Sequence, residues 1–191
     1  VALIGAVVLL YAPRSVFSEL PEVRCNLFFT AYLLCLTGLM GMATTGDVFN
    51  LFVFLEISSL TSYALIASGP DRRALRASYQ YLVMGTVGAT FYVIGVGLLY
   101  MMTGTLNMVD LAERLQPVLM TRTVLAAFAF LVVSIRLKLA LFPLHLWLPN
   151  AYAYAPSVVT AFLAATATKV SIYVFVRFFY GIFGTAYAFD T

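Results

Sequence analysis

Four charged residues lie inside long apolar stretches of the sequence, where a charge is costly. They are Glu56 in residues 48–69, Arg136 and Lys138 in residues 122–148, and Lys169 in residues 156–184. A charged side chain at the centre of a bilayer costs roughly 2.5–3.5 kcal/mol on insertion scales. Such residues pair with each other or face a wet cavity, and they mark paths for ions and protons. The chemistry they indicate is therefore proton or cation transfer.

A pair of Glu56 with Lys138 is the arrangement that compensates the most charge, because each group keeps the other ionised. Lys169 then has no obvious carboxylate partner, and a buried lysine without a partner can exchange its proton. The alternative is a buried pair that only fixes helix register. Arg136 lies nearer a helix end than Glu56 does, so it has either a direct role or a side chain that reaches the interface.

The segment from Lys138 to Pro149, KLALFPLHLWLP, is the most unusual in the chain. Pro143 lacks a backbone donor and clashes with the preceding turn, which predicts a kink or break around residues 139–143. Unwound backbone at membrane depth is tolerated only where it is buried in protein or lines water. The segment therefore predicts a polar site beside Lys138.

Two further side chains suit a proton relay to a buried lysine. His145, the only histidine, titrates near neutral pH; the alternative is a histidine hydrogen-bonded to its own loop. Tyr173 follows Lys169 by four residues, on the same helix face. Trp147 is expected as an anchor at the membrane interface.

The composition predicts an all-α integral membrane protein with lipid covering much of its surface. Hydrophobic residues make up 63% of the 191 residues and charged residues 10%, against about 25% charged in soluble domains. A spanning helix needs about 20 apolar residues. Five full spans are predicted, at residues 25–45, 48–69, 77–102, 122–148 and 156–184, with a partial one at 1–12. A short surface helix is predicted at Met108–Leu115. Residues 1–191 form one membrane domain, which we read as a fragment of a longer polypeptide.

Several other functions are disfavoured by the sequence. The net charge is only +3 and the arginines form no basic stripe, so nucleic acid is not expected as a partner. The sequence has no metal-ligand cluster, no cofactor ligands and no nucleophile triad, so no cofactor and no bond chemistry are expected in this chain. The 13–24 and 70–76 loops contain five arginines, whereas the loops predicted on the other side of the membrane contain two. This excess predicts that the 13–24 and 70–76 loops face the cytoplasm.

Three stretches in this order resemble one family of membrane proteins. They are residues 45–56 (TGDVFNLFVFLE) with 62–66, residues 138–149 with 155–158, and Lys169 with Tyr173 and Arg177. The sequence is similar to the antiporter-like, proton-translocating subunits of respiratory complex I, membrane-bound hydrogenases and Mrp-type sodium/proton antiporters. Within this family it looks most like the D subunit of the Mrp-type cation/proton antiporters.

The resemblance implies the first of two inverted five-helix repeats, at residues 25–184, in a multi-pass protein of the cell (inner) membrane. Glu56 matches the glutamate that pairs with the lysine of the broken helix, here Lys138, and Lys169 matches the central channel lysine. Implied partners are other membrane subunits of one complex, the lipid bilayer, protons and sodium. Asn150 and Tyr152 replace the Asp and His common in the family, which puts the usual entrance roles of those two positions in doubt.

Three functions follow as hypotheses. The first is an ion-translocation half-channel, either of a cation/proton antiporter or of a proton-translocating NADH:quinone oxidoreductase-type complex. The second is a structural scaffold whose charges only fix packing. The third, a quinone-binding redox subunit, has no cofactor ligands in the sequence to support it.

Overall fold

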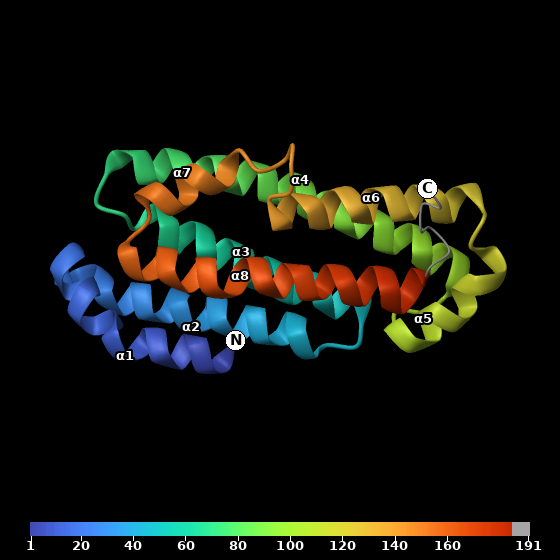
Figure 1. Cartoon of the computed structure of the whole chain (residues 1–191), viewed down its shortest axis with the longest axis horizontal. Coiled ribbons are helices and arrows are strands. Elements are labelled where there is room, and N and C mark those ends of the chain that lie inside the picture. Colours follow the sequence, from blue (N-terminus) through green and yellow to red (C-terminus); the bar gives the residue numbers. More distant parts are fainter. Residues whose placement is uncertain (185–191) are drawn as a thin grey trace.

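The structure is a computed structural model that describes residues 1–184, apart from the side chains of residues 22 and 23. The described part is helical and contains no strand (Figure 1). The helices are α1 (Ala2–Glu19), α2 (Glu22–Thr44), α3 (Val48–Ala67), α4 (Arg72–Thr103), α5 (Met108–Leu115), α6 (Arg122–Leu139), α7 (Trp147–Tyr154) and α8 (Ser157–Phe178). A π-helical turn, Phe179–Phe183, extends α8.

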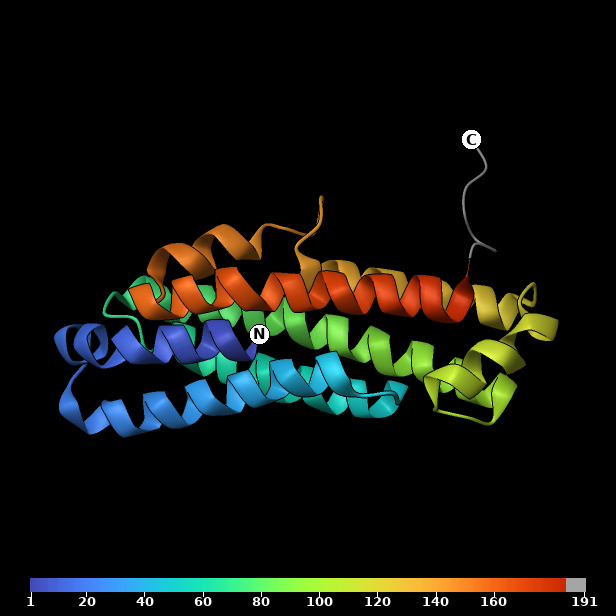
Figure 2. The same ribbon diagram turned by 60° about the horizontal axis from the view of Figure 1, so that its bottom comes forward.

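The long helices lie side by side along one axis, as the two views in Figures 1 and 2 show. α3 packs between α2 and α4, α4 also packs against α6, and α8 contacts α1, α2 and α6. Among the described residues, five helices are long and apolar enough to cross a membrane: Ala2–Glu19, Arg24–Thr44, Val48–Ala67, Arg72–Thr103 and Ser157–Phe183. The predicted all-α, multi-pass membrane fold is confirmed.

The predicted span at 122–148 is broken after Leu139, as the sequence predicted around residues 139–143, but the interruption extends to residue 146. Its helix, α6, ends at Leu139, and a second helix, α7, starts only at Trp147. α6 contains Arg122, Arg136 and Lys138, and it is not among the five helices apolar enough to cross by composition alone. The interruption therefore divides the predicted span into a charged helix and a short second helix.

Two predicted loops are mostly helix. α1 continues through Pro13 to Glu19, because its buried face of Val8, Ala12 and Val16 keeps a spacing of four past the proline. α4 begins at Arg72, inside the predicted 70–76 loop, because the Asp71 carboxylate accepts a hydrogen bond from the backbone N–H of Arg73 (2.8 Å) and caps the helix.

The end of the bundle near α5 is held by paired helix caps. Asp47 caps α3 and Asn107 caps α5, and the two residues pair in an isolated antiparallel bridge. The predicted surface helix at Met108–Leu115 is present. On this helix, outside the spans, hydrogen bonds from Thr105 and from the Arg114 guanidinium lower the pKa of Asp110. These contacts fix the end of α3, the helix that carries Glu56.

Gly38 sets the close approach of α2 to α3. A Cβ at this position would lie 2.7 Å from the backbone nitrogen of Ser58 and 2.9 Å from the backbone oxygen of Phe54. Because backbone cannot move aside as a side chain can, we expect Gly38→Ala to push α2 away from α3 and to lower the free energy of unfolding by about 1–3 kcal/mol.

The measurement is the thermal unfolding of the full-length protein in detergent. Gly97→Ala is the matched control, since Gly97 is exposed in α4 and has nothing within 4 Å of a built Cβ. This control should be neutral or slightly stabilising, because alanine favours helix over glycine. Equal unfolding temperatures for the two variants would contradict the close approach.

Candidate functional site

Lys138 is a buried cation in the middle of the bundle. It lies in the last turn of α6, with 8% of its surface exposed. Its Nζ donates a hydrogen bond of 2.6 Å to Oγ of Ser59, a residue of α3 that is 4% exposed. A hydrogen bond from a charged donor contributes about 1.5–3 kcal/mol, about twice a neutral one. Ser59 is therefore the direct partner of Lys138.

Glu56 lies one helical turn before Ser59 on α3, so the two residues share a face. The predicted direct ion pair of Glu56 with Lys138 is not present: the ion pairs among the described side chains are Arg73–Asp71 and Arg114–Asp110. Oε1 of the Glu56 carboxylate is buried without a hydrogen-bond partner in the described part of the chain. Ser59 therefore makes the direct contact with Lys138 that the sequence analysis predicted for Glu56.

The helix break lies next to Lys138 and leaves carbonyl groups to be satisfied. The C-cap of α6 is Ala140, a non-glycine residue with a positive φ of 53°, three residues before Pro143. The carbonyl of Leu137 accepts a hydrogen bond from the Trp147 indole N–H, at 3.1 Å. The Trp147 ring is stacked on Tyr81 of α4, with centroids 3.9 Å apart. Trp147 is 5% exposed, so its predicted place at the membrane interface is wrong.

A cavity of about 40 Å³ connects Lys138 with α8. Besides Lys138, its polar lining consists of hydroxyl-bearing residues on α3, α4, α7 and α8: Ser58, Ser59, Ser62, Tyr81, Tyr152, Thr168 and Ser171. A water molecule needs about 10–15 Å³ of such volume and two to four polar partners, so the cavity has room for two or three waters. The arrangement can pass a proton between Lys138 and the polar face of α8.

Lys169 lies on α8, immediately after Thr168 of the cavity wall. Its side chain is exposed on this chain, and Nζ donates to the backbone oxygen of Ala164. The sequence-based expectation of a buried lysine therefore does not hold for this chain, because no described helix covers that face of α8. Tyr173 is 47% exposed, and Arg177 donates to the backbone oxygen of Thr45.

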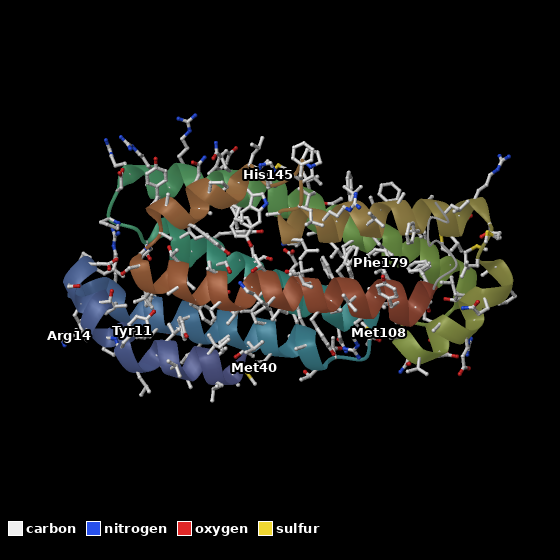
Figure 3. The ribbon with its side chains drawn as sticks, viewed as in Figure 1. Tyr11, Arg14, Met40, Met108, His145 and Phe179 are labelled. Atoms are coloured by element: carbon white, nitrogen blue, oxygen red, sulfur yellow. The ribbon has the colours of Figure 1, made fainter. Side chains whose placement is uncertain are left out.

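The remaining predicted residues lie around the break rather than in the cavity. Arg136 is exposed, although its backbone oxygen accepts from the N–H groups of Ala140 and Leu141. His145 lies at the break and is half-buried (Figure 3); its Nδ1 is buried without a hydrogen-bond partner in the described residues. The alternative of a histidine bonded through Nδ1 to its own loop is therefore not observed.

The residue that sequence reasoning missed is Ser59. It belongs to a run of hydroxyl residues, Ser58, Ser59, Thr61 and Ser62, that begins two residues after Glu56. That run was the available signal, since hydroxyls beside a buried carboxylate serve its hydrogen bonding. Of the two departures from the family pattern, Tyr152 lines the cavity and Asn150 donates to Gln80.

Residues 45–189 match the family described as NADH:quinone oxidoreductase/Mrp antiporter, transmembrane. The chain is 50% identical over 180 residues to the N subunit of the NADH-quinone oxidoreductase of Desulforudis audaxviator, covering 94% of this chain and 36% of that protein. It is 37% identical over 182 residues to the D subunit of the Na(+)/H(+) antiporter of Bacillus subtilis, covering 95% of this chain and 36% of that protein. The chain therefore spans about a third of the length of these relatives.

Solved structures give the same relationship. A chain of the membrane-bound sulfane sulfur reductase, an archaeal respiratory membrane complex, superposes with a TM-score of 0.76 and 39% identity, over 81% of this chain and 31% of that one. A chain of the Mrp complex from Dietzia sp. DQ12-45-1b superposes with a TM-score of 0.75 and 32% identity, over 83% of this chain and 30% of that one. Both neighbours are parts of multisubunit membrane complexes.

Proposed function

The chain belongs to the NADH:quinone oxidoreductase/Mrp antiporter transmembrane family, and from this premise we propose that it forms a half-channel for protons or cations. The observation that carries the proposal is the position of Lys138. The buried ammonium is bonded to Ser59, and one turn away Oε1 of Glu56 has no hydrogen-bond partner among the described residues, so the ammonium has two possible partners. Glu56, Lys138 and Lys169 are the groups that transfer the ion.

The proposed cycle moves the Lys138 side chain between Ser59 and Glu56. When the Lys138 ammonium is bonded to Ser59, it lies at the cavity wall. Its positive charge there disfavours a second positive charge on Lys169. On Glu56 the two charges neutralise each other, and a proton can then reach Lys169 through the hydroxyls and water of the cavity. His145, Tyr173 and Arg136 are candidate relays at the two ends of this path, and Pro143 contributes to the break that brings backbone and water to Lys138.

Lys169 completes the path only if its exposed face meets other protein. The chain covers about a third of its relatives' length, and we propose that residues 25–184 form the first of two repeats, with the second repeat over this face of α8. Other membrane subunits, protons and sodium are the proposed partners, by likeness to the antiporter and respiratory complexes. The rival hypothesis is a scaffold in which the same charges hold helices together and move nothing.

Ser59→Ala tests the exchange directly. Without the hydroxyl, Lys138 loses its partner at the cavity wall, so we expect ion transport by the full-length protein in its complex to fall at least about tenfold, which corresponds to the lower end of the contribution of a charged hydrogen bond, about 1.5 kcal/mol. Ser59→Thr keeps the hydroxyl and should restore transport. The measurement is the initial rate of transport in proteoliposomes as a function of pH, and both the rate and the profile should change.

Ser58→Ala is the matched control for this experiment. Ser58 also lines the cavity, but its hydroxyl donates only within its own helix, to the backbone oxygen of Leu55. We expect transport close to that of the parent protein. If Ser58→Ala and Ser59→Ala behave alike, the hydroxyl at position 59 has no special part in the exchange.

A further inference from the structure

A basic hollow lies between the first turns of α4 and the short helix α7. It has a volume of about 400 Å³ and is lined by Arg73, Arg76, Ala77, Gln80, Asn150 and Tyr154. α7 packs along this part of α4 (Figure 1). No acidic side chain lines the hollow, so its two guanidinium groups present a net positive charge to any ligand.

The Arg73 side chain of this hollow is held by a weak ion pair and by a neutral ring. Arg73 lies over the ring of Tyr154, with 5.7 Å from its Cζ to the ring centroid. Its only ion pair among the described residues is an exposed contact of 3.9 Å with Asp71, which contributes little. Both guanidinium groups therefore remain available to an anion, and guanidinium matches the geometry of a phosphate.

An apolar groove continues from the basic hollow along the same two helices. It has a volume of about 490 Å³, and its apolar lining comes from Tyr79, Val83, Met84, Leu146 and Trp147. The two hollows share Gln80 and Asn150, whose amide groups are hydrogen-bonded to each other at 3.3 Å. The two hollows form one continuous amphipathic site. It is charged at one end, has the two amides at the junction and is apolar beyond them.

The length and direction of this site match one leaflet of a membrane. Arg73, Arg76, Gln80, Val83 and Met84 form a stripe along one face of α4 that is about 16 Å long. Half of a bilayer's hydrocarbon core is about 15 Å thick. α4 is one of the five helices able to span the membrane, so its charged first turns lie toward one interface and the groove runs toward the interior.

We propose that this site binds one anionic phospholipid, with its phosphate between Arg73 and Arg76 and an acyl chain in the groove between α4 and α7. Trp147 forms part of both the groove and the wall of the cavity at Lys138. An acyl chain in the groove thus packs against the ring that separates this cavity from lipid. The proposal does not depend on the ion path, because it rests on a different set of side chains.

Lipid binding to the delipidated full-length protein, followed by native mass spectrometry, tests this site. Phosphatidylglycerol should bind more tightly than phosphatidylcholine with the same acyl chains. Arg73→Gln and Arg76→Gln should each weaken phosphatidylglycerol binding about fivefold, the contribution of one basic residue near an anionic lipid. Arg72→Gln is the matched control, since Arg72 is in the same helical turn and does not line the hollow; its effect should be below about twofold.

Two further arms identify the occupant. Soluble glycerol phosphate should bind far more weakly than the lipid; equal binding would make this a site for free phosphate and overturn the lipid. A photo-crosslinking amino acid at position 83, in native membranes, should form adducts with lipid. Adducts with a neighbouring protein chain instead, equal affinity for the two lipids, or an Arg72→Gln effect as large as that of Arg76→Gln would each overturn the proposal.

Discussion

Lys138→Met in the full-length protein is expected to reduce ion transport at least about a hundredfold, the usual contribution of a positioned proton-transfer group. Methionine fills nearly the same volume as lysine and suits a site that is 8% exposed, so α6 should still pack and the complex should assemble. What is lost is the ammonium that we propose to alternate between Ser59 and Glu56. The measurement is transport in proteoliposomes, with subunit content checked on the same preparation.

Arg136→Met is the matched control, because it removes a positive charge two residues earlier on the same helix. The Arg136 side chain is exposed and lines no part of the cavity, so transport should fall by less than about tenfold, even if the arginine helps proton entry. The double variant Glu56→Gln with Lys138→Met then separates the two hypotheses. A scaffold would retain transport once both charges are gone, whereas a half-channel would lose it; retained transport in this variant would sink the half-channel.

The fold was largely predictable because a helix that crosses lipid needs a long apolar run, which is visible in the sequence. Long apolar runs predicted α2, α3 and α8 closely, and the surface helix at Met108–Leu115 is where the sequence placed it. The errors lie at helix ends, because local capping determines the residue at which a helix begins or ends. The cap at Asp71 starts α4 earlier than the hydropathy indicated. α1 continues through the proline at which the hydropathy ended it, because one face of the helix stays buried.

The site was less predictable, since it depends on which atoms meet across helices. Charge counting paired Glu56 with Lys138, because it considers ionised groups and ignores hydroxyls. The ammonium instead meets Ser59; the run of hydroxyl residues after Glu56 was a signal for a polar site, but it does not show which of the hydroxyls meets Lys138 before the helices are assembled. Trp147 was misplaced for the same reason: its role in capping the broken α6 follows from the turn after Leu139, a detail of backbone geometry.

Lys169→Ala is expected to abolish transport through the full-length protein as completely as Lys138→Met, again at least about a hundredfold. The residue adjoins the wall of the cavity that leads from Lys138, so we propose it as the next group to accept a proton on that path. Because its side chain is exposed on this chain, its removal should not disturb the packing of α8. Assembly of the complex should therefore be unchanged, and transport is the property to measure.

Lys169→Arg distinguishes proton exchange from a fixed charge at the same place. Arginine keeps the positive charge but does not release its proton in proteins, so it should be as inactive as alanine if Lys169 must titrate. Tyr173→Phe, on the same exposed face, tests whether the neighbouring phenol takes part, and it should leave most of the transport if the lysine alone carries the proton. Full transport in Lys169→Arg would mean that only its charge matters, and full transport in Lys169→Ala would remove this residue from the path.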